Sequence, residues 1–145
     1  MIGPLLALVF AAAPALEAQS GCINVSGTII GSFTSKTTIA GTVSGGLAGT
    51  VSAIILDIQA SADGALHVQM QHTFTTIGGS ELRTMDQAVL SPTAPPEYRM
   101  DTLYTITGGT GNFANATGFL HNHGDVNLST GAVSLRYDGR ICGIQ

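Results

Sequence analysis

Residues 66–74 of the chain read LHVQMQHTF, and this stretch alternates between two kinds of side chain. Successive side chains of a β-strand point to opposite faces, so a period of two predicts a strand with one buried face. The apolar face consists of Leu66, Val68, Met70, His72 and Phe74, and the polar face of His67, Gln69, Gln71 and Thr73. Such a half-buried strand is typical of antiparallel sheets.

The same alternation occurs near both ends of the chain. One apolar set consists of Ile23, Val25, Gly27 and Ile29, and the other of Val133, Leu135, Tyr137 and Ile141. Cys22 and Cys142 fall on the opposite, polar faces of these two stretches. If the two strands are neighbours in one sheet, both sulfur atoms project to the same outer side, where a bridge would join the chain ends.

Cys22 and Cys142 are the two cysteines of the sequence. A lone pair of thiols in an exported protein normally forms a disulfide. A metal site would require more cysteines, and a catalytic thiol would require a basic neighbour. We therefore predict a Cys22–Cys142 disulfide, and closing a loop of more than about 100 residues stabilises a fold by roughly 4–5 kcal/mol.

The N-terminal residues indicate export. Residues 2–13 are apolar apart from Gly3 and Pro4, and small residues follow at Ala13, Ala15 and Ala18. This is the pattern of a secretory signal peptide, with cleavage expected after Ala15 or Ala18. We expect residues 1–18 to be the signal peptide and residues 19–145 to form one secreted domain. An N-terminal strand or a lipid-facing anchor is the alternative interpretation.

Shorter alternations predict five further strands, at about residues 37–43, 48–59, 81–90, 103–107 and 119–126. Asp63-Gly64 and Gly78-Gly79 are hairpin turn signals. Residues 91–96 contain three prolines and predict a loop. Residues 54–56, Ile-Ile-Leu, predict a segment buried on both faces. The fold class is therefore all-β, a single antiparallel barrel of roughly eight strands.

Composition excludes several classes of partner. Charged residues make up 10% of the chain and its net charge is −4, with five Lys and Arg residues. So few basic residues cannot form the stripe that neutralises nucleic-acid phosphates, and they disfavour anionic membrane surfaces. No apolar run is long enough to span a bilayer. Small molecules or other proteins are the remaining partners.

The most specific motif is residues 104–118, YTITGGTGNFANATG. Gly108, Gly109 and Gly111 permit positive φ where the chain turns out of a strand, and Phe113 is placed to plug a barrel end. The segment resembles the glycine-rich turn of plant allene oxide cyclases and dirigent proteins, and of secreted bacterial proteins with allene-oxide-cyclase-like barrels. This resemblance implies an eight-stranded antiparallel barrel, frequently oligomeric, whose lumen holds an apolar ligand. It specifies a fold and carries over no catalytic residue.

His72 is the most interesting candidate, because it lies on an apolar strand face. Burial would favour its neutral form, which can act as a base or orient a ligand oxygen; a hydrogen-bonded core histidine is the plainer alternative. Asp86 shares parity with apolar neighbours, so it is expected to point inward and to form an acid–base pair with Tyr104 or His72. The expected lumenal ligand-binding residues are Met70, His72, Phe74, Asp86 and Tyr104.

His121, His123 and Asp125 alternate on another strand. This spacing can hold a transition metal, but a solvated outer face is the simpler interpretation. We expect no metal and no cofactor.

Three functions fit these residues. The first is a non-catalytic secreted barrel that binds a small apolar molecule, which the lack of clustered ionisable groups favours. The second, implied by the resemblance, is a cyclase or isomerase that works by confining its substrate. The third is a structural or interaction module with a solidly packed core. A lumenal cavity would support the first two, so enzymatic activity stays open at this point.

Overall fold

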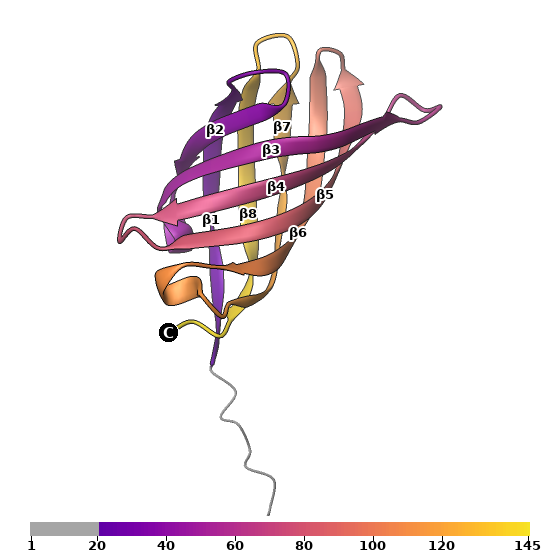
Figure 1. Cartoon of the computed structure of the whole chain (residues 1–145). Helices are drawn as coiled ribbons and strands as arrows, with labels where there is room; N and C mark the ends of the chain where they lie inside the picture. The colour runs from indigo at the N-terminus through magenta and orange to yellow at the C-terminus, as the bar shows by residue number, and fades with distance from the viewer. Residues whose placement is uncertain (1–20) are drawn as a thin grey trace, which may run out of the picture.

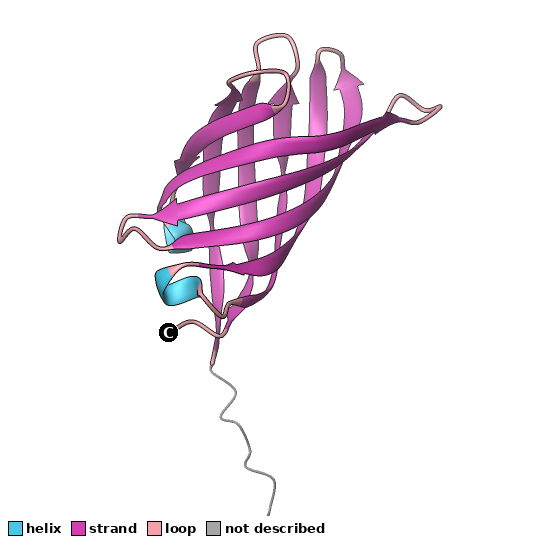
Figure 2. Ribbon diagram, in the orientation of Figure 1, coloured by secondary structure: helices cyan, strands magenta, loops and turns pink. Residues whose placement is uncertain are grey.

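The computed structural model describes residues 21–145, so the expected signal peptide lies outside the described residues. Eight β-strands and two short 3-10 helices follow one another along the chain (Figures 1 and 2). The elements are β1 (Cys22–Phe33), β2 (Thr38–Val43), η1 (Gly45–Leu47), β3 (Gly49–Ala60), β4 (Leu66–Thr76), β5 (Glu81–Ala94), β6 (Glu97–Gly109), η2 (Gly111–Phe113), β7 (Thr117–Asn127) and β8 (Ala132–Cys142). Within the described residues, no helix is long and apolar enough to cross a membrane.

The strands form one closed antiparallel barrel. Each strand pairs with the next one along the chain, and β8 pairs with β1 to complete the cylinder. The β1–β8 seam runs from Cys22 opposite Cys142 to Ser32 opposite Ala132. The predicted fold class is confirmed. Closure leaves no unpaired sheet edge, which is how a barrel avoids edge-to-edge association.

A disulfide joins Cys22 and Cys142 at one end of this seam, as predicted. The two residues lie directly opposite each other, and their Cα atoms are 4.0 Å apart. Two residues that are 120 positions apart in the sequence are therefore adjacent in space.

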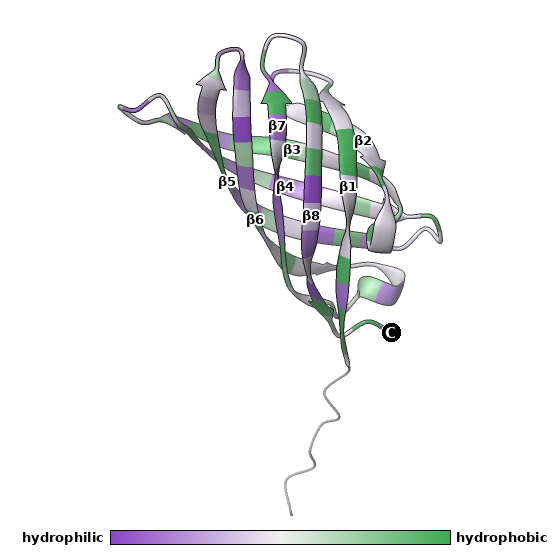
Figure 3. Cartoon of the chain, turned by 180° about the vertical axis from the view of Figure 1, so that it is seen from behind, coloured by the Kyte–Doolittle hydropathy of each residue, from purple (hydrophilic) through white to green (hydrophobic). Residues whose placement is uncertain are grey.

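Alternation along the strands separates an apolar interior from a mostly polar exterior. Figure 3 shows the alternation as bands of colour along the strands. On β4, Val68, Met70, His72 and Phe74 are buried, in agreement with the predicted face. The prediction that residues 54–56 are buried on both faces is wrong, because Ile54 and Leu56 are half exposed on the outside. Helices or a second sheet would be needed to cover that face, and a single-layered barrel has neither.

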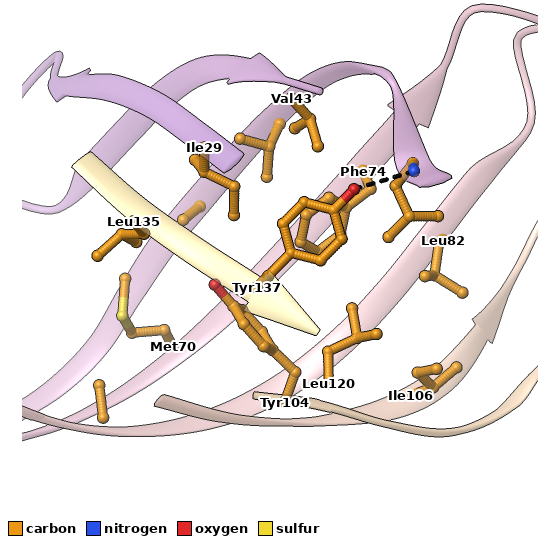
Figure 4. Packing of buried hydrophobic residues seen from close by; sticks show 14 of the residues in the cluster. Ile29, Val43, Met70, Phe74, Leu82, Tyr104, Ile106, Leu120, Leu135 and Tyr137 are labelled. Carbon is orange, nitrogen blue, oxygen red and sulfur yellow. Dashed lines mark hydrogen bonds between the residues drawn. The ribbon is translucent and has the colours of Figure 1, made fainter. Parts of the chain in front are cut away.

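One end of the barrel is closed by packed side chains. Leu47 of η1 and Phe113 of η2 are both buried in the core, so Phe113 fills the barrel end as expected. The Tyr137 hydroxyl donates to the Ser44 carbonyl at 2.6 Å and accepts from the Leu47 N–H at 3.0 Å. The second of these bonds is the dashed line in Figure 4.

The glycine-rich turn leads into this closed end. Gly108 and Gly111 have φ values of 128° and 55°, which confirms the need for glycine. Gly109 is different, because its φ is not positive. A Cβ atom there would lie 1.9 Å from the Glu81 carbonyl oxygen, so close approach of β5 is what requires glycine.

The predicted loop at residues 91–96 is wrong in extent. β5 continues through Ala94 and β6 begins at Glu97, so Pro95 and Pro96 alone form the connection. Pro92 has no N–H to donate, and it is accommodated beside a register irregularity between Pro92 and Ala94. The β5–β6 hairpin is therefore longer than the proline content suggests.

Candidate ligand-binding site

The other end of the barrel contains a cavity of about 540 Å³. Its apolar wall receives side chains from all eight strands: Phe33, Ile39, Ile55, Ile58, Leu66, Val68, Met70, Leu90, Met100, Val126 and Val133. Inward positions of all eight strands meet here and leave this space unfilled. The cavity is thus a feature of the whole cylinder, and no single loop forms it.

Polar residues surround the mouth of the cavity. Thr34, Ser35 and Lys36 come from the β1–β2 connection, and Ser129 and Thr130 from the β7–β8 connection. These two connections lie together at the end of the barrel opposite the C-terminus (Figure 1). A polar rim around an apolar interior is typical of sites that bind small molecules.

The expected lumenal residues lie at different depths. Met70 lines the cavity directly. His72 lines a separate void of about 20 Å³, which shares Ile39, Met100 and Val133 with the cavity wall. Phe74 and Tyr104 lie in the packed core toward the closed end, and Figure 4 shows them near Tyr137. The five residues therefore extend from the cavity into the core.

Asp86 is buried, points inward as predicted, and pairs with His72. Its Oδ2 atom lies 2.5 Å from His72 Nδ1, and the carboxylate side chain is completely shielded from solvent. The strand register explains this contact. Asp86 lies opposite Tyr104 on β6 and opposite Met70 on β4, and His72 is the next inward-facing residue of β4. A buried carboxylate requires such a partner.

The His72 ring is held from two further sides. Its centroid lies 4.7 Å from the Tyr104 ring in an edge-on arrangement and 6.0 Å from the Phe74 ring in a stacked one. Two aromatic rings and the Asp86 carboxylate therefore contact this side chain.

Tyr104 is fully buried, and its hydroxyl oxygen accepts a hydrogen bond from the Asn122 amide. Burial raises the pKa of Tyr104, and the Asp86 charge raises it further. The phenol is accordingly held in its neutral form across the ordinary pH range.

Together these side chains form a polar belt across the interior faces of β4–β7, composed of His72, Thr84, Asp86, Thr102, Tyr104 and Asn122. Sequence reasoning missed Thr84, Thr102 and Asn122. Parity could have found them, because each alternates with buried apolar residues on its own strand. Four buried oxygens of the belt have no partner among the described residues: Thr84 Oγ1, Asp86 Oδ1, Thr102 Oγ1 and Asn122 Oδ1.

The second histidine group lies outside the barrel. The exposed His121 side chain has its Nε2 atom 3.9 Å from Asp101 Oδ1, and its ring centroid lies 5.9 Å from that of His123. Across residues 21–145, no group of three His, Cys, Asp or Glu side chains is placed to hold a metal ion. Arg83 and Arg99 form surface pairs with Glu81 and Asp125.

These observations define a closed eight-stranded antiparallel β-barrel with an apolar lumenal cavity and a buried polar belt beneath it. The sequence matches no protein-family model and no curated protein. Among solved structures, the chain is similar to a pterocarpan synthase dirigent protein, with 15% identity and a TM-score of 0.37. The alignment covers 96% of this chain and 99% of that chain.

Proposed function

We propose that this protein is an extracytoplasmic binding protein that holds one small apolar molecule in its lumen without converting it. The observation that carries the proposal is the open cavity of about 540 Å³, whose wall is apolar on all eight strands. Ligand pockets commonly measure about 300–1,000 Å³. A rigid barrel can keep such a space open because each wall strand is hydrogen-bonded on both sides.

The driving force for binding is the removal of apolar surface from water. Each Å² of ligand surface buried against this wall contributes about 25 cal/mol before the cost of immobilising the ligand. Because the wall is already formed, little ordering entropy is lost by the protein itself.

The disulfide supports the extracytoplasmic location, because disulfides persist in oxidising compartments. The apolar run at residues 2–13 supports the same location. The glycine-rich motif of residues 104–118, with its resemblance to barrels that hold apolar ligands, fits the proposed lumenal site.

The first test is mass spectrometry of lipophilic material that co-purifies with the exported protein, combined with calorimetric titration of the empty protein with naphthalene. We expect a recurrent bound species and saturable naphthalene binding. Empty preparations together with no naphthalene binding would contradict the proposal.

A pair of matched variants locates the site. Leu66→Glu places a carboxylate in the cavity wall, whereas Leu103→Glu makes the same change at a half-exposed position on the outer face. Burying a charge beside an apolar ligand is unfavourable, so we expect Leu66→Glu to weaken naphthalene binding at least about tenfold. Leu103→Glu should bind like the wild type, and circular dichroism checks that both variants are folded. Equal binding by both variants would place the ligand elsewhere.

A further inference from the structure

The small void next to the cavity is lined by an imidazole, that of His72, with one nitrogen already committed to a hydrogen bond. Asp86 Oδ2 lies 2.5 Å from His72 Nδ1, and an ionised carboxylate only accepts hydrogen bonds. With Asp86 ionised, Nδ1 carries the proton of this bond. In the neutral ring the second nitrogen, Nε2, is then a bare acceptor.

The His72 side chain has space beside it. The His72 side chain retains 7% exposure, whereas that of Asp86 has none. His72 lines the void of about 20 Å³, and none of the other polar-belt residues does. A space of roughly 10–15 Å³ is sufficient for one water molecule, so this void can hold one water or one ligand hydroxyl.

The surrounding belt contains donors as well as acceptors, because the unpartnered Thr84 and Thr102 hydroxyls can do both. The unpartnered Asp86 Oδ1 and Asn122 Oδ1 atoms can accept hydrogen bonds and cannot donate them. Asp86 and Asn122 are, respectively, 3% and 0% exposed, so bulk water does not satisfy them. At the void itself the polar side chain is His72, and its bare Nε2 atom favours a guest that brings an O–H donor and disfavours one that brings only another acceptor.

The void and the cavity share part of their walls. Ile39, Met100 and Val133 line both spaces. Met100 is unbranched and has three rotatable side-chain bonds, so it can change rotamer without displacing a strand. Rotation of Met100 would connect the apolar cavity to His72.

We propose that the cavity is selective for apolar molecules that carry a hydroxyl group, an alcohol or a phenol, and that the hydroxyl enters first and donates to Nε2 of His72. Asp86 is the positioning residue that fixes the tautomer of the ring. This inference rests on the proposed function, because it specifies the polar end of the ligand that the cavity holds. No covalent step is involved.

The test compares three ligands of similar shape by calorimetry: 2-naphthol, 2-methoxynaphthalene and naphthalene. One additional hydrogen bond predicts that 2-naphthol binds about 3- to 10-fold tighter than the other two. Three equal affinities would overturn the hydroxyl selectivity and leave the proposed function standing. Absence of binding by all three would overturn both.

Variants test the role of His72. His72→Phe should keep naphthalene binding and lose the preference for 2-naphthol, and Asp86→Asn should reduce that preference. His121→Phe alters an exposed histidine on the outer face and should keep it. A His72→Phe variant that folds and still prefers 2-naphthol would overturn the assignment.

If His72→Phe does not fold, the wild type provides the answer by ¹⁵N NMR of its imidazoles. We expect one buried histidine protonated at Nδ1, whose unprotonated Nε2 resonance shifts when 2-naphthol is added. The same resonance should be unaffected by naphthalene. A buried histidine protonated at Nε2, or an Nε2 resonance that 2-naphthol leaves unchanged, would overturn the proposal.

Discussion

At the scale of single residues, burial decides the chemistry of this interior. Tyr104 is completely buried, and its hydroxyl has the Asn122 amide as its hydrogen-bond partner. Desolvation is the main reason that its pKa lies above the ordinary value of 10.0, with the Asp86 charge adding to the shift. The folded protein therefore keeps a proton on Tyr104 that the unfolded chain releases in alkaline solution.

This difference predicts a dependence of stability on pH. Above pH 10.0 the unfolded chain binds fewer protons than the folded one, so the unfolding free energy should be fully retained below that pH and decline above it. Tyr104→Phe should lower the unfolding free energy by about 1–3 kcal/mol at neutral pH, because the Asn122 amide is left unpaired. Its unfolding free energy should also decline less steeply with pH in alkaline solution. Urea unfolding at several pH values measures both. Phe74→Leu, which removes no titrating group, should keep the wild-type slope, and an equally steep slope in Tyr104→Phe would contradict the prediction.

Parity along single strands was sufficient to predict which way the site residues face. His72 and Asp86 both point inward as the alternation predicted. The sequence suggested their contact but could not establish it, because the contact depends on the strand register. In this register Asp86 lies opposite Met70, and Thr84, two residues before Asp86, lies opposite His72. Such a register is determined by the hairpin turn and by burial of the whole strand.

At the scale of elements, strand interiors were easier to predict than strand ends. Turn signals at Gly64 and Gly79 were confirmed, with φ values of 85° and 91°. Pro92 was misleading, since it lies in β5 beside a register irregularity. The Ile-Ile-Leu segment at residues 54–56 was also misleading, because a hydrophobic run does not show whether anything covers its outer face.

The η1 helix is the element whose attachment is most easily tested. Tyr137 fixes it through hydrogen bonds to the Ser44 carbonyl and the Leu47 N–H. Tyr137→Phe should therefore cost about 1–3 kcal/mol of unfolding free energy. It should also speed hydrogen exchange at the Leu47 amide. Tyr98→Phe is the control, because no side-chain hydrogen bond to Tyr98 is present within residues 21–145, and it should change stability little. Unchanged exchange at Leu47 in Tyr137→Phe would show that η1 is held by packing alone.

At the scale of the whole molecule, closure of the barrel separates the stabilising features from the binding site. The disulfide and the two short helices lie at the closed end, whereas the cavity opens among the β1–β2 and β7–β8 connections at the other end (Figure 1). Strand pairing continues along the β1–β8 seam to Ser32 opposite Ala132, far from the sulfur atoms. Closure of the cylinder near the cavity therefore depends on hydrogen bonds, and the disulfide acts mainly on the unfolded chain.

This separation predicts that stability and binding respond differently to loss of the disulfide. Replacing both Cys22 and Cys142 by Ser releases a cross-link across 120 residues, which should lower the unfolding free energy by about 4–5 kcal/mol in the chain-entropy model. Naphthalene affinity, measured below the unfolding transition, should change less than about twofold, because the ladder that encloses the cavity persists. Wild-type protein treated with a reductant should match the double variant in urea unfolding and in calorimetry. A parallel loss of affinity and stability would mean that the seam opens along its whole length once the sulfur bridge is removed, and that the disulfide maintains the shape of the cavity as well as the stability of the fold.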